Sequence, residues 1–133
     1  MNAIETIKKI YAAFGRGDVP TILDQLAENV DWNNQGTAGR ELPWHGNFTG
    51  RGNVPKFFAA IGEHLDIPVF EPKEFLQTGN NVAVRLHLEM VMKKNGKKAV
   101  FDSIHFWTFD PSGKVCAYRH FNDTAGELLA WRS

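Results

Sequence analysis

"SIHFWTFDPSGKVCAYRHFND", residues 103–123, predicts two strands joined by a turn. Its central "DPSG", with Pro second and Gly fourth, is typical of a type I turn. Five polar residues interrupt the apolar ones: His105, Arg119, His120, Asn122 and Asp123. If some of these groups face an enclosed cavity, the chain is a candidate enzyme. If they all face solvent, it is only a compact fold.

A long strand precedes this pair. Apolar residues alternate with others along it: Val82, Val84, Leu86, Leu88, Met90 and Met92. This period of two predicts a strand with one buried face. Asn95-Gly96 then predicts a hairpin with a two-residue loop, followed by a strand from about Lys97 to Phe109. The last strand is expected over 114–122.

The simplest loops fix a register for these three strands. Leu86 is then opposite His105, His105 opposite Tyr118, and Ser103 opposite His120. In this register the two histidines are diagonal neighbours, with Cβ atoms about 7–8 Å apart. Both can therefore touch one ligand without bonding directly to each other.

The register also assigns the side chains to two faces. One face is an apolar wall with a small polar cluster, which is typical of a small-molecule pocket. It carries Val84, Leu86, Leu88, Met90, Phe101, Ser103, His105, Trp107, Tyr118, His120 and Asn122. The other face mixes charge with aromatic rings and suits solvent or a dimer contact. It carries Arg85, His87, Glu89, Asp102, Ile104, Phe106, Arg119 and Phe121.

The first 65 residues predict three helices and a strand. Helical spacing recurs in three sets: Ile4, Ile7, Ile10, Tyr11 and Phe14, then Ile22, Leu23 and Leu26, then Val54, Phe57, Phe58, Ile61 and Leu65. Asn2 with Glu5, Asp18 and Asn53 are the expected N-caps. "NVDWNN", 29–34, predicts a strand, and a Gly- and Pro-rich loop over 35–50 follows it.

Two further elements complete the expected order. A strand over 69–78 contains Pro72, which suits a sheet edge or a bulge. Thr124 with Glu127 predicts a capping box for a short C-terminal helix, and Asp123 is also expected to cap it.

Length and composition exclude several classes of protein. The 133 residues suit a single domain over 1–133, and 43% hydrophobic with 23% charged residues is ordinary for a soluble protein. Fifteen basic residues balance fifteen acidic ones, which argues against a nucleic-acid partner. No apolar run approaches the roughly 20 residues that span a membrane, and we expect no secretion signal. Cys116, the sole cysteine, fits a cytoplasmic location and excludes an internal disulfide.

Three stretches together resemble the SnoaL-like group of the NTF2-like superfamily. They are "YAAFGRGDVPTILDQLAENVDW" (11–32), "FTGRGNVPKFFAAI" (48–61) and "HFWTFDPSGKVCAYRHFND" (105–123). The resemblance implies a cone-shaped α+β fold, in which three N-terminal helices pack on a strongly curved mixed or antiparallel sheet with a short C-terminal helix. It also implies a deep apolar pocket and, commonly, a homodimer. Activities in such families include polyketide cyclisation, ketosteroid isomerisation and epoxide hydrolysis, and some members only bind.

The chain departs from these families at their acids. The catalytic Asp of ketosteroid isomerases falls on Trp32, their oxyanion-binding Asp on His105, and their helical Tyr on Ile10, beside Tyr11. The Asp–Arg–Asp set of limonene-epoxide hydrolases falls on Leu86, Leu88 and His120. The acid/base Asp of the SnoaL cyclases also falls on His120. Positions 105 and 120 therefore hold imidazoles where the resemblance implies carboxylates.

These imidazoles suggest acid–base chemistry without a cofactor. Burial disfavours the imidazolium, so both rings are expected to be neutral. His120 would take a proton next to a carbonyl or from water, and His105 would donate a hydrogen bond to the oxygen where charge develops. The expected substrate is a small, largely apolar carbonyl compound. Its expected contacts are Trp32, Leu86, Leu88, Trp107, Tyr118 and Asn122.

Three simpler interpretations stay open. The histidines could be core residues satisfied by Tyr118, Ser103 or water, in a non-catalytic ligand-binding or dimerisation module. A metal site at the two histidines and Asn122 would lack an acidic ligand, so no metal is expected. The tryptophans could be plain core.

The long loop also has two interpretations. Trp44 and His45 could belong to a lid, because binding residues are often carried by loops. The alternative is a surface loop with one buried anchor.

Overall fold

A strongly curved six-stranded sheet is the frame of the protein in the computed structural model, which describes residues 2–34 and 41–133. The elements in chain order are α1 (Ala3–Gly15), α2 (Val19–Leu23), β1 (Leu26–Asn34), β2 (Gly46–Asn47), α3 (Val54–His64), β3 (Leu65–Thr78), β4 (Asn81–Met92), β5 (Lys98–Phe109), β6 (Val115–Phe121) and α4 (Thr124–Arg132). The strand order is β2-β1-β6-β5-β4-β3. Only β1 and β6 pair in parallel, so the sheet is mixed and the predicted α+β architecture is confirmed.

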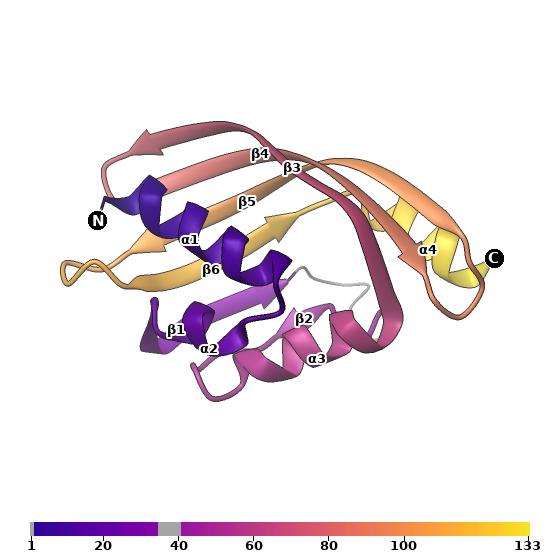
Figure 1. The fold of residues 1–133 in the computed structure, drawn as a ribbon, viewed down its shortest axis with the longest axis horizontal. Helices are drawn as coiled ribbons and strands as arrows, with labels where there is room; N and C mark the ends of the chain where they lie inside the picture. Colours follow the sequence, from indigo (N-terminus) through magenta and orange to yellow (C-terminus); the bar gives the residue numbers. More distant parts are fainter. Residues whose placement is uncertain (1, 35–40) are drawn as a thin grey trace.

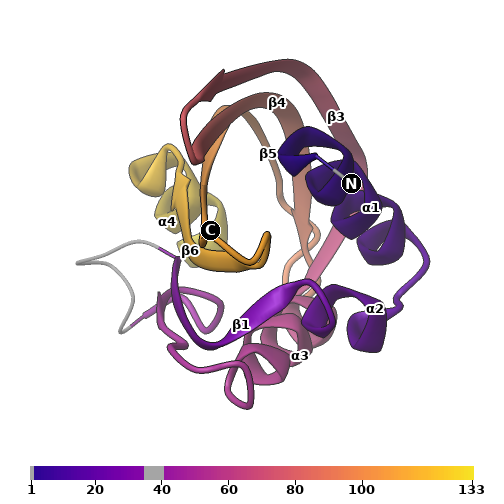
Figure 2. The same ribbon diagram turned by 90° about the vertical axis from the view of Figure 1, so that its left-hand side faces the viewer.

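The sheet wraps around the three N-terminal helices (Figure 2). α1 crosses the concave face, and α2 and α3 close the open side below it, whereas α4 lies at the far end of the long strands (Figure 1). Among the described residues, no helix is long and apolar enough to cross a membrane. The curved sheet and the helices thus enclose a space between them, as the resemblance implied.

The predicted helix starts are confirmed at two of three places. The side chains of Asn2 and Asp18 accept from the backbone N–H groups of Glu5 and Thr21 at 2.9 and 3.2 Å. Asn53 precedes α3 but does not cap it, because its amide donates to the Thr49 carbonyl instead. Leu26 and Leu65, expected on helix faces, are the first residues of β1 and β3. They are buried all the same, at 0% and 4% exposure.

The β4–β5 loop is two residues longer than predicted. The N–H of Met92 donates to the carbonyl of Lys97 at 2.8 Å, which leaves residues 93–96 in the loop. Val84 is therefore opposite His105 and Leu86 opposite Ser103, so the predicted pairs are wrong by two residues. Because successive side chains alternate between faces, a shift of two keeps every residue on its predicted face.

The pairing of β5 with β6 also differs from the predicted register. A turn over 110–113 is confirmed by a bond from the Gly113 N–H to the Asp110 carbonyl at 3.0 Å. Phe109 pairs with Val115, one residue beyond the predicted Lys114, and a register shift between Thr108 and Phe109 adds a second residue, so the pairs beyond it are displaced by two. His105 is directly opposite His120, so the predicted diagonal arrangement is wrong, although both rings stay on the predicted face.

The edge strand β3 and the start of α4 agree in part with the sequence predictions. β3 is an edge strand, and its register shifts between Pro72 and Glu74, which confirms the expected bulge. Asp123 caps α4 by accepting from the Gly126 N–H at 3.0 Å. The capping box of Thr124 and Glu127 is wrong, because the Glu127 side chain is buried and points elsewhere.

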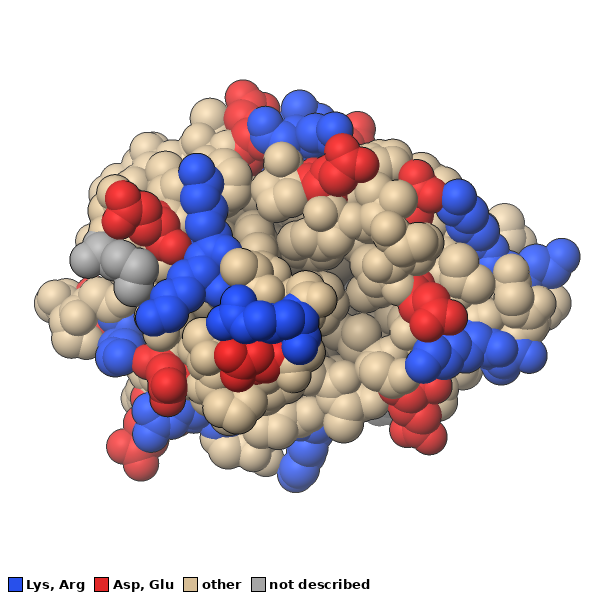
Figure 3. All heavy atoms as spheres, viewed as in Figure 1, with Lys and Arg blue, Asp and Glu red and all other residues tan. Residues whose placement is uncertain are grey.

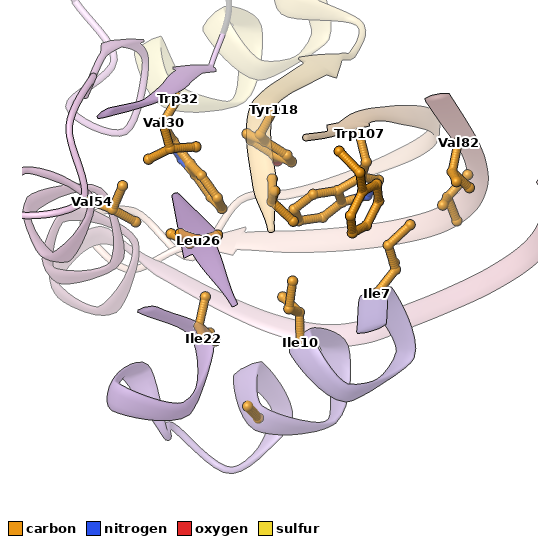
Figure 4. Packing of buried hydrophobic residues seen from close by; sticks show 14 of the residues in the cluster. Ile7, Ile10, Ile22, Leu26, Val30, Trp32, Val54, Val82, Trp107 and Tyr118 are labelled. Atoms are coloured by element: carbon orange, nitrogen blue, oxygen red, sulfur yellow. The ribbon is translucent and has the colours of Figure 1, made fainter. Parts of the chain in front are cut away.

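Aromatic and branched side chains fill the space between α1 and the sheet. Figure 4 shows Ile7 and Ile10 of α1 facing Tyr118 and Trp107, with Trp32 beside Tyr118. The rings of Trp32 and Tyr118 stack with centroids 4.1 Å apart. A second apolar cluster, around Trp44, Leu88 and Phe101, lies toward α4. The candidate site has lining residues from both clusters.

Candidate functional site

An apolar cavity lies between the concave face of the sheet and the helices α1 and α3. It has a volume of about 60 Å³, and its walls are almost entirely apolar. The lining residues are Ile10, Tyr11, Phe14, Trp32, Asn34, Trp44, Phe57, Phe58, Ile61, Leu65, Ile67, Phe70, Leu88, Met90, His105, Trp107, Tyr118 and His120. One water needs about 10–15 Å³, so this inner cavity has room for a small ligand group rather than a drug-sized molecule.

A wider vestibule of about 340 Å³ adjoins the inner cavity. The two share the side chains of Tyr11, Phe14, Ile61, Leu65, Ile67 and Phe70. Figure 3 shows a hollow walled by uncharged residues between α1 and the start of β3, with charged residues of both signs around it. A ligand larger than the inner cavity can therefore extend from it into the vestibule.

His105 and His120 meet at the polar end of the inner cavity. Their rings are 4.6 Å apart between centroids and almost perpendicular, at 87°. Each residue is only 6% exposed. Two imidazoles this close and this buried disfavour a charge on either, because each positive charge would be desolvated and would repel the other.

His105 is held from the α1 side. The Tyr11 hydroxyl lies 2.8 Å from its Nδ1 and accepts from the indole N–H of Trp107 at 3.1 Å. Since an indole N–H can only donate, the hydroxyl proton of Tyr11 is free to donate to His105 Nδ1. With the hydroxyl as donor, the neutral His105 ring carries its own proton on Nε2. Burial lowers the pKa of His105 well below its usual range, and His120 lowers it further.

His120 is held from the β1 side by an amide. Asn34 donates its Nδ2 to the backbone carbonyl of Trp44 at 2.7 Å, and its Oδ1 lies 3.0 Å from His120 Nδ1. A carbonyl can only accept, so this bond fixes the amide orientation and makes His120 Nδ1 the donor. Burial lowers the pKa of His120 to about 4, although the nearby Glu127 charge opposes the shift. The neutral His120 therefore carries a lone pair on Nε2.

Two buried polar atoms in the described ranges have no hydrogen-bond partner. They are Nε2 of His120 and Nε1 of Trp32, and both rings line the cavity. An unsatisfied buried polar atom costs about 1–3 kcal/mol, so such atoms are uncommon without a reason. One is an acceptor and the other a donor. Each of these two lining residues therefore holds one buried polar atom that no described protein group satisfies.

A buried carboxylate lies behind His120. Glu127 of α4 is 1% exposed. Its Oε2 accepts from Trp44 Nε1 at 2.7 Å and from His45 Nε2 at 2.8 Å, and its Oε1 accepts from Asn122 at 2.6 Å. Burial raises the pKa of Glu127, but the bonds and charge of His45 and the bond from Trp44 outweigh this, and the pKa is lowered. The carboxylate is therefore ionised at neutral pH.

The predicted ligand contacts divide into two groups. Trp32, Leu88, Trp107 and Tyr118 line the inner cavity together with the two histidines. Leu86 and Asn122 do not line it. Leu86 is fully buried in the cluster near α4, and Asn122 accepts from Ser103 at 2.6 Å and donates to Glu127.

Sequence reasoning named neither Tyr11 nor Asn34 nor Glu127 as a site residue. Tyr11 and Asn34 touch the two histidines, and Glu127 reaches Asn34 through Trp44. Asn34 follows Trp32 by two residues, so alternation along β1 could have placed it on the cavity face. No comparable signal exists for Glu127, whose spacing from Thr124 indicated a cap.

The loop before β2 supplies two of these partners. Trp44 and His45 are 1% and 5% exposed, so both are buried anchors rather than surface residues. Glu41 of the same loop pairs with Arg132 of α4, with Oε1 2.6 Å from the guanidinium Nη2. The part of the predicted loop over 35–40 lies outside the described residues. The segment over 41–45 therefore contacts α4 at both of its ends, through Glu41 with Arg132 and through Trp44 and His45 with Glu127.

The polar groups do not form a metal-binding set. Among the residues that the structure describes, no group of three or more His, Cys, Asp or Glu side chains is arranged to hold a metal ion. Glu127 is the acid nearest to the histidines, and His45, Trp44 and Asn122 already occupy its two oxygens. The chemistry that the arrangement supports is hydrogen bonding and proton transfer by imidazole.

Taken together, the fold and site define an α+β protein whose curved sheet holds a buried apolar cavity. The SnoaL-like domain family matches residues 7–118, and the chain belongs to that family, as the sequence predicted. Among curated proteins, no sequence matches this chain.

Solved structures confirm the NTF2-like fold. An NTF2-like protein of unknown function from Burkholderia pseudomallei is 25% identical with a TM-score of 0.88, over 98% of this chain and 97% of that one. TerC, co-crystallized with polyporic acid, is 26% identical with a TM-score of 0.86, over 98% of each chain. IdmH from Streptomyces antibioticus, a candidate polyketide cyclase, is 19% identical with a TM-score of 0.77 over the whole of both chains, which shows the fold alone.

Proposed function

We propose that this protein binds a small, largely apolar carbonyl compound and catalyses proton transfer on it. His120 Nε2 is the base, and His105 Nε2–H donates to the carbonyl oxygen as negative charge develops there. One arrangement supports this more than any other: the two imidazoles face each other, with His105 Nδ1 beside the Tyr11 hydroxyl and His120 Nδ1 beside the Asn34 oxygen. With the hydroxyl as donor, the two rings carry their protons on opposite nitrogens, so one accepts and the other donates. A preorganised donor at a developing oxyanion is often worth several kcal/mol.

The cavity supports a neutral substrate with an apolar body. Its lining contains no Asp, Glu, Lys or Arg side chain, and its aromatic walls suit a flat ring system. Trp32 Nε1–H can donate to a second oxygen of the ligand, because it is buried without a partner. TerC, which was co-crystallized with polyporic acid, lends support to a small-molecule ligand in this fold.

The lowered pKa of His120 limits the class of substrate on which it can act as a base. A base whose pKa is about 4 removes only comparatively acidic protons. Carbon atoms next to both a carbonyl and an aromatic ring carry such protons. The substrate class that we propose is therefore an aromatic compound with an activated carbonyl.

Exchange of the benzylic α-protons of 2-tetralone with deuterium tests this reaction directly. We expect the wild-type protein to accelerate this exchange in D2O, as measured by NMR. The His120→Gln variant should lose at least about 10²-fold of the acceleration. His87→Gln is the matched control. His87 lies on the outer face against Glu89, and its replacement should leave the rate unchanged.

The alternative outcomes have defined meanings. Equal exchange by His120→Gln and wild type would remove His120 as the base. Quenching of Trp32 and Trp107 fluorescence by 2-tetralone without any exchange would identify a non-catalytic ligand-binding protein, the alternative function. An absence of both would exclude this class of ligand.

We further propose a homodimer through the outer face of β5 and β6. Val100 and Phe121 are 57% and 49% exposed there, and Ile104 lies opposite Phe121. Exposed apolar side chains grouped on one sheet face are typical of an interaction surface. Sedimentation analysis of wild type and Phe121→Asp tests this, since a dimer through this face would dissociate in the variant and a wild-type monomer would exclude it.

A further inference from the structure

A chain of hydrogen bonds connects Glu127 of α4 to His120 of β6. The Glu127 carboxylate accepts from the indole of Trp44 at 2.7 Å. The backbone carbonyl of Trp44 accepts from the amide of Asn34, also at 2.7 Å, and the Asn34 oxygen lies 3.0 Å from His120 Nδ1. The three links join α4, the loop before β2, β1 and β6.

Each link in this chain has only one possible direction. An indole N–H donates and a carboxylate accepts; a backbone carbonyl accepts, so the amide nitrogen must face it. The amide oxygen is then left for His120. A rotated Asn34 amide would set its NH2 group against His120 Nδ1 and reverse the proton arrangement of the ring.

We propose that Glu127 is a positioning residue for His120. By binding the Trp44 indole it holds the Trp44 carbonyl in place, which orients Asn34 and keeps the proton of His120 on Nδ1. His120 Nε2 then presents its lone pair to the cavity. The importance of this lone pair rests on the proposed function, but the positioning itself does not.

The cost of burying Glu127 supports a role beyond stability. An ionised carboxylate with 1% exposure is expensive to desolvate, and a whole buried ionic group of residues can often be replaced by apolar ones without loss of stability. Glu127 nevertheless has donors on both oxygens, from Trp44, His45 and Asn122. These bonds fix the carboxylate and the loop together, which is the property that orientation of Asn34 requires.

Charge gives a second line of support. The charged groups that shift the pKa of His120 are Glu127 and His45, and of these two Glu127 is the acid. Burial lowers the pKa of His120, while the Glu127 carboxylate raises it. The carboxylate thus makes the His120 lone pair more basic without touching the ring.

The tautomer of His120 in the free protein is the decisive measurement. Long-range 1H–15N NMR of histidine-labelled protein shows which ring nitrogen carries the proton. We expect a single Nδ1–H form of His120 in the wild type. Trp44→Phe deletes the indole N–H but keeps an aromatic ring, and we expect His120 to become a mixture of both tautomers.

Ser103→Ala is the matched control. It also deletes one buried hydrogen bond of the network, but on the Asn122 side of Glu127, which does not lead to Asn34. In the Ser103→Ala variant, His120 should keep the single Nδ1–H tautomer of the wild type. The His105 signals, which depend on Tyr11, report that the fold of each variant is intact.

Two results would overturn the proposal: a wild-type His120 with its proton on Nε2, or a folded Trp44→Phe that retains the pure Nδ1–H form. If Trp44→Phe does not fold, Asn34→Leu tests the last link in the same way. No substrate is present in this measurement, so its result is independent of the 2-tetralone experiment. Where both proposals hold, Trp44→Phe lowers kcat for exchange far more than it changes KM.

Discussion

The two ends of the cavity hold their histidines by different means. On the α1 side, His105 meets the Tyr11 hydroxyl, which is backed by the Trp107 indole, and no formal charge takes part. On the α4 side, His120 meets the Asn34 amide, which is backed through Trp44 by the ionised Glu127. Two residues complete the first arrangement, whereas the second draws on four separate elements of the fold.

This difference decides the chemistry of two otherwise similar rings. In the proposed arrangement the hydroxyl of Tyr11 donates to His105, and the oxygen of Asn34 accepts from His120, so the two neutral imidazoles carry their protons on opposite nitrogens. Burial alone would make them equivalent. The partner of Nδ1, rather than the depth of the ring, determines which histidine accepts a proton and which donates one.

The largest effect is expected from removing the acid on the α4 side. Glu127→Leu leaves Trp44 Nε1, His45 Nε2 and the Asn122 amide without their shared acceptor. We expect the free energy of unfolding to fall by about 3–5 kcal/mol, as measured in urea. Glu63→Leu, at an exposed carboxylate of α3, is the control and should stay near the wild type. A Glu127→Leu protein as stable as wild type would mean that the buried network is dispensable.

The free energy of unfolding is expected to fall as the pH drops from 6.5 to 4, because the two histidines are buried as neutral rings. An unfolded histidine titrates near 6.5 and the folded His120 at about 4, so between these values only the unfolded chain binds the proton. Stability is therefore complete above pH 6.5 and falls as the pH drops toward 4. The loss from His120 is about 3 kcal/mol, and the depressed pKa of His105 adds to it.

Urea unfolding at several pH values measures this slope. His120→Gln should make the dependence clearly shallower, since the variant has one fewer buried imidazole that resists protonation. An unchanged slope in the variant would show that His120 titrates normally in the folded protein, and would contradict the burial argument.

The smallest expected effect comes from the α1 side. Tyr11→Phe removes one hydroxyl, which leaves the Trp107 indole and His105 Nδ1 without a partner. We expect a loss of about 1–2 kcal/mol in urea unfolding. By NMR, His105 should become a mixture of tautomers while His120 keeps its single form. If His120 changes as well, the two sides of the cavity are coupled, and they cannot be treated as separate arrangements.

The predicted faces of the strands survived two errors in register. The β4–β5 loop has four residues instead of two, and a bulge precedes the β5–β6 turn. Both errors shifted the pairing by an even number, so His105, Trp107, Tyr118 and His120 stayed on the concave face. Alternation along a strand is a local property, and it therefore carries over from sequence to structure.

Alternation along the strands did not predict the hydrogen-bond partners of the two histidines. The alternative interpretation had Tyr118, Ser103 or water as partners of the rings, whereas the structure has Tyr11 and Asn34. Tyr11 reaches His105 across 94 positions of the chain, and Asn34 reaches His120 across 86. Contacts of this range depend on how a helix or a parallel strand is placed against the sheet, which periodicity does not specify.

The sequence by itself determined the order of helices and strands, the apolar face of the sheet and the membership in a SnoaL-like fold. The order of elements and the apolar face follow from side-chain alternation, helical spacing, capping and turn residues, all of which act over a few positions. The family was indicated by resemblance to SnoaL-like proteins. Only the tertiary structure decided that the two imidazoles face each other, and that Glu127 is buried behind one of them. Curvature of the sheet and docking of α1 and α4 bring those groups together, because the hydrogen bonds of a buried polar group must be satisfied by whatever the completed fold places beside it.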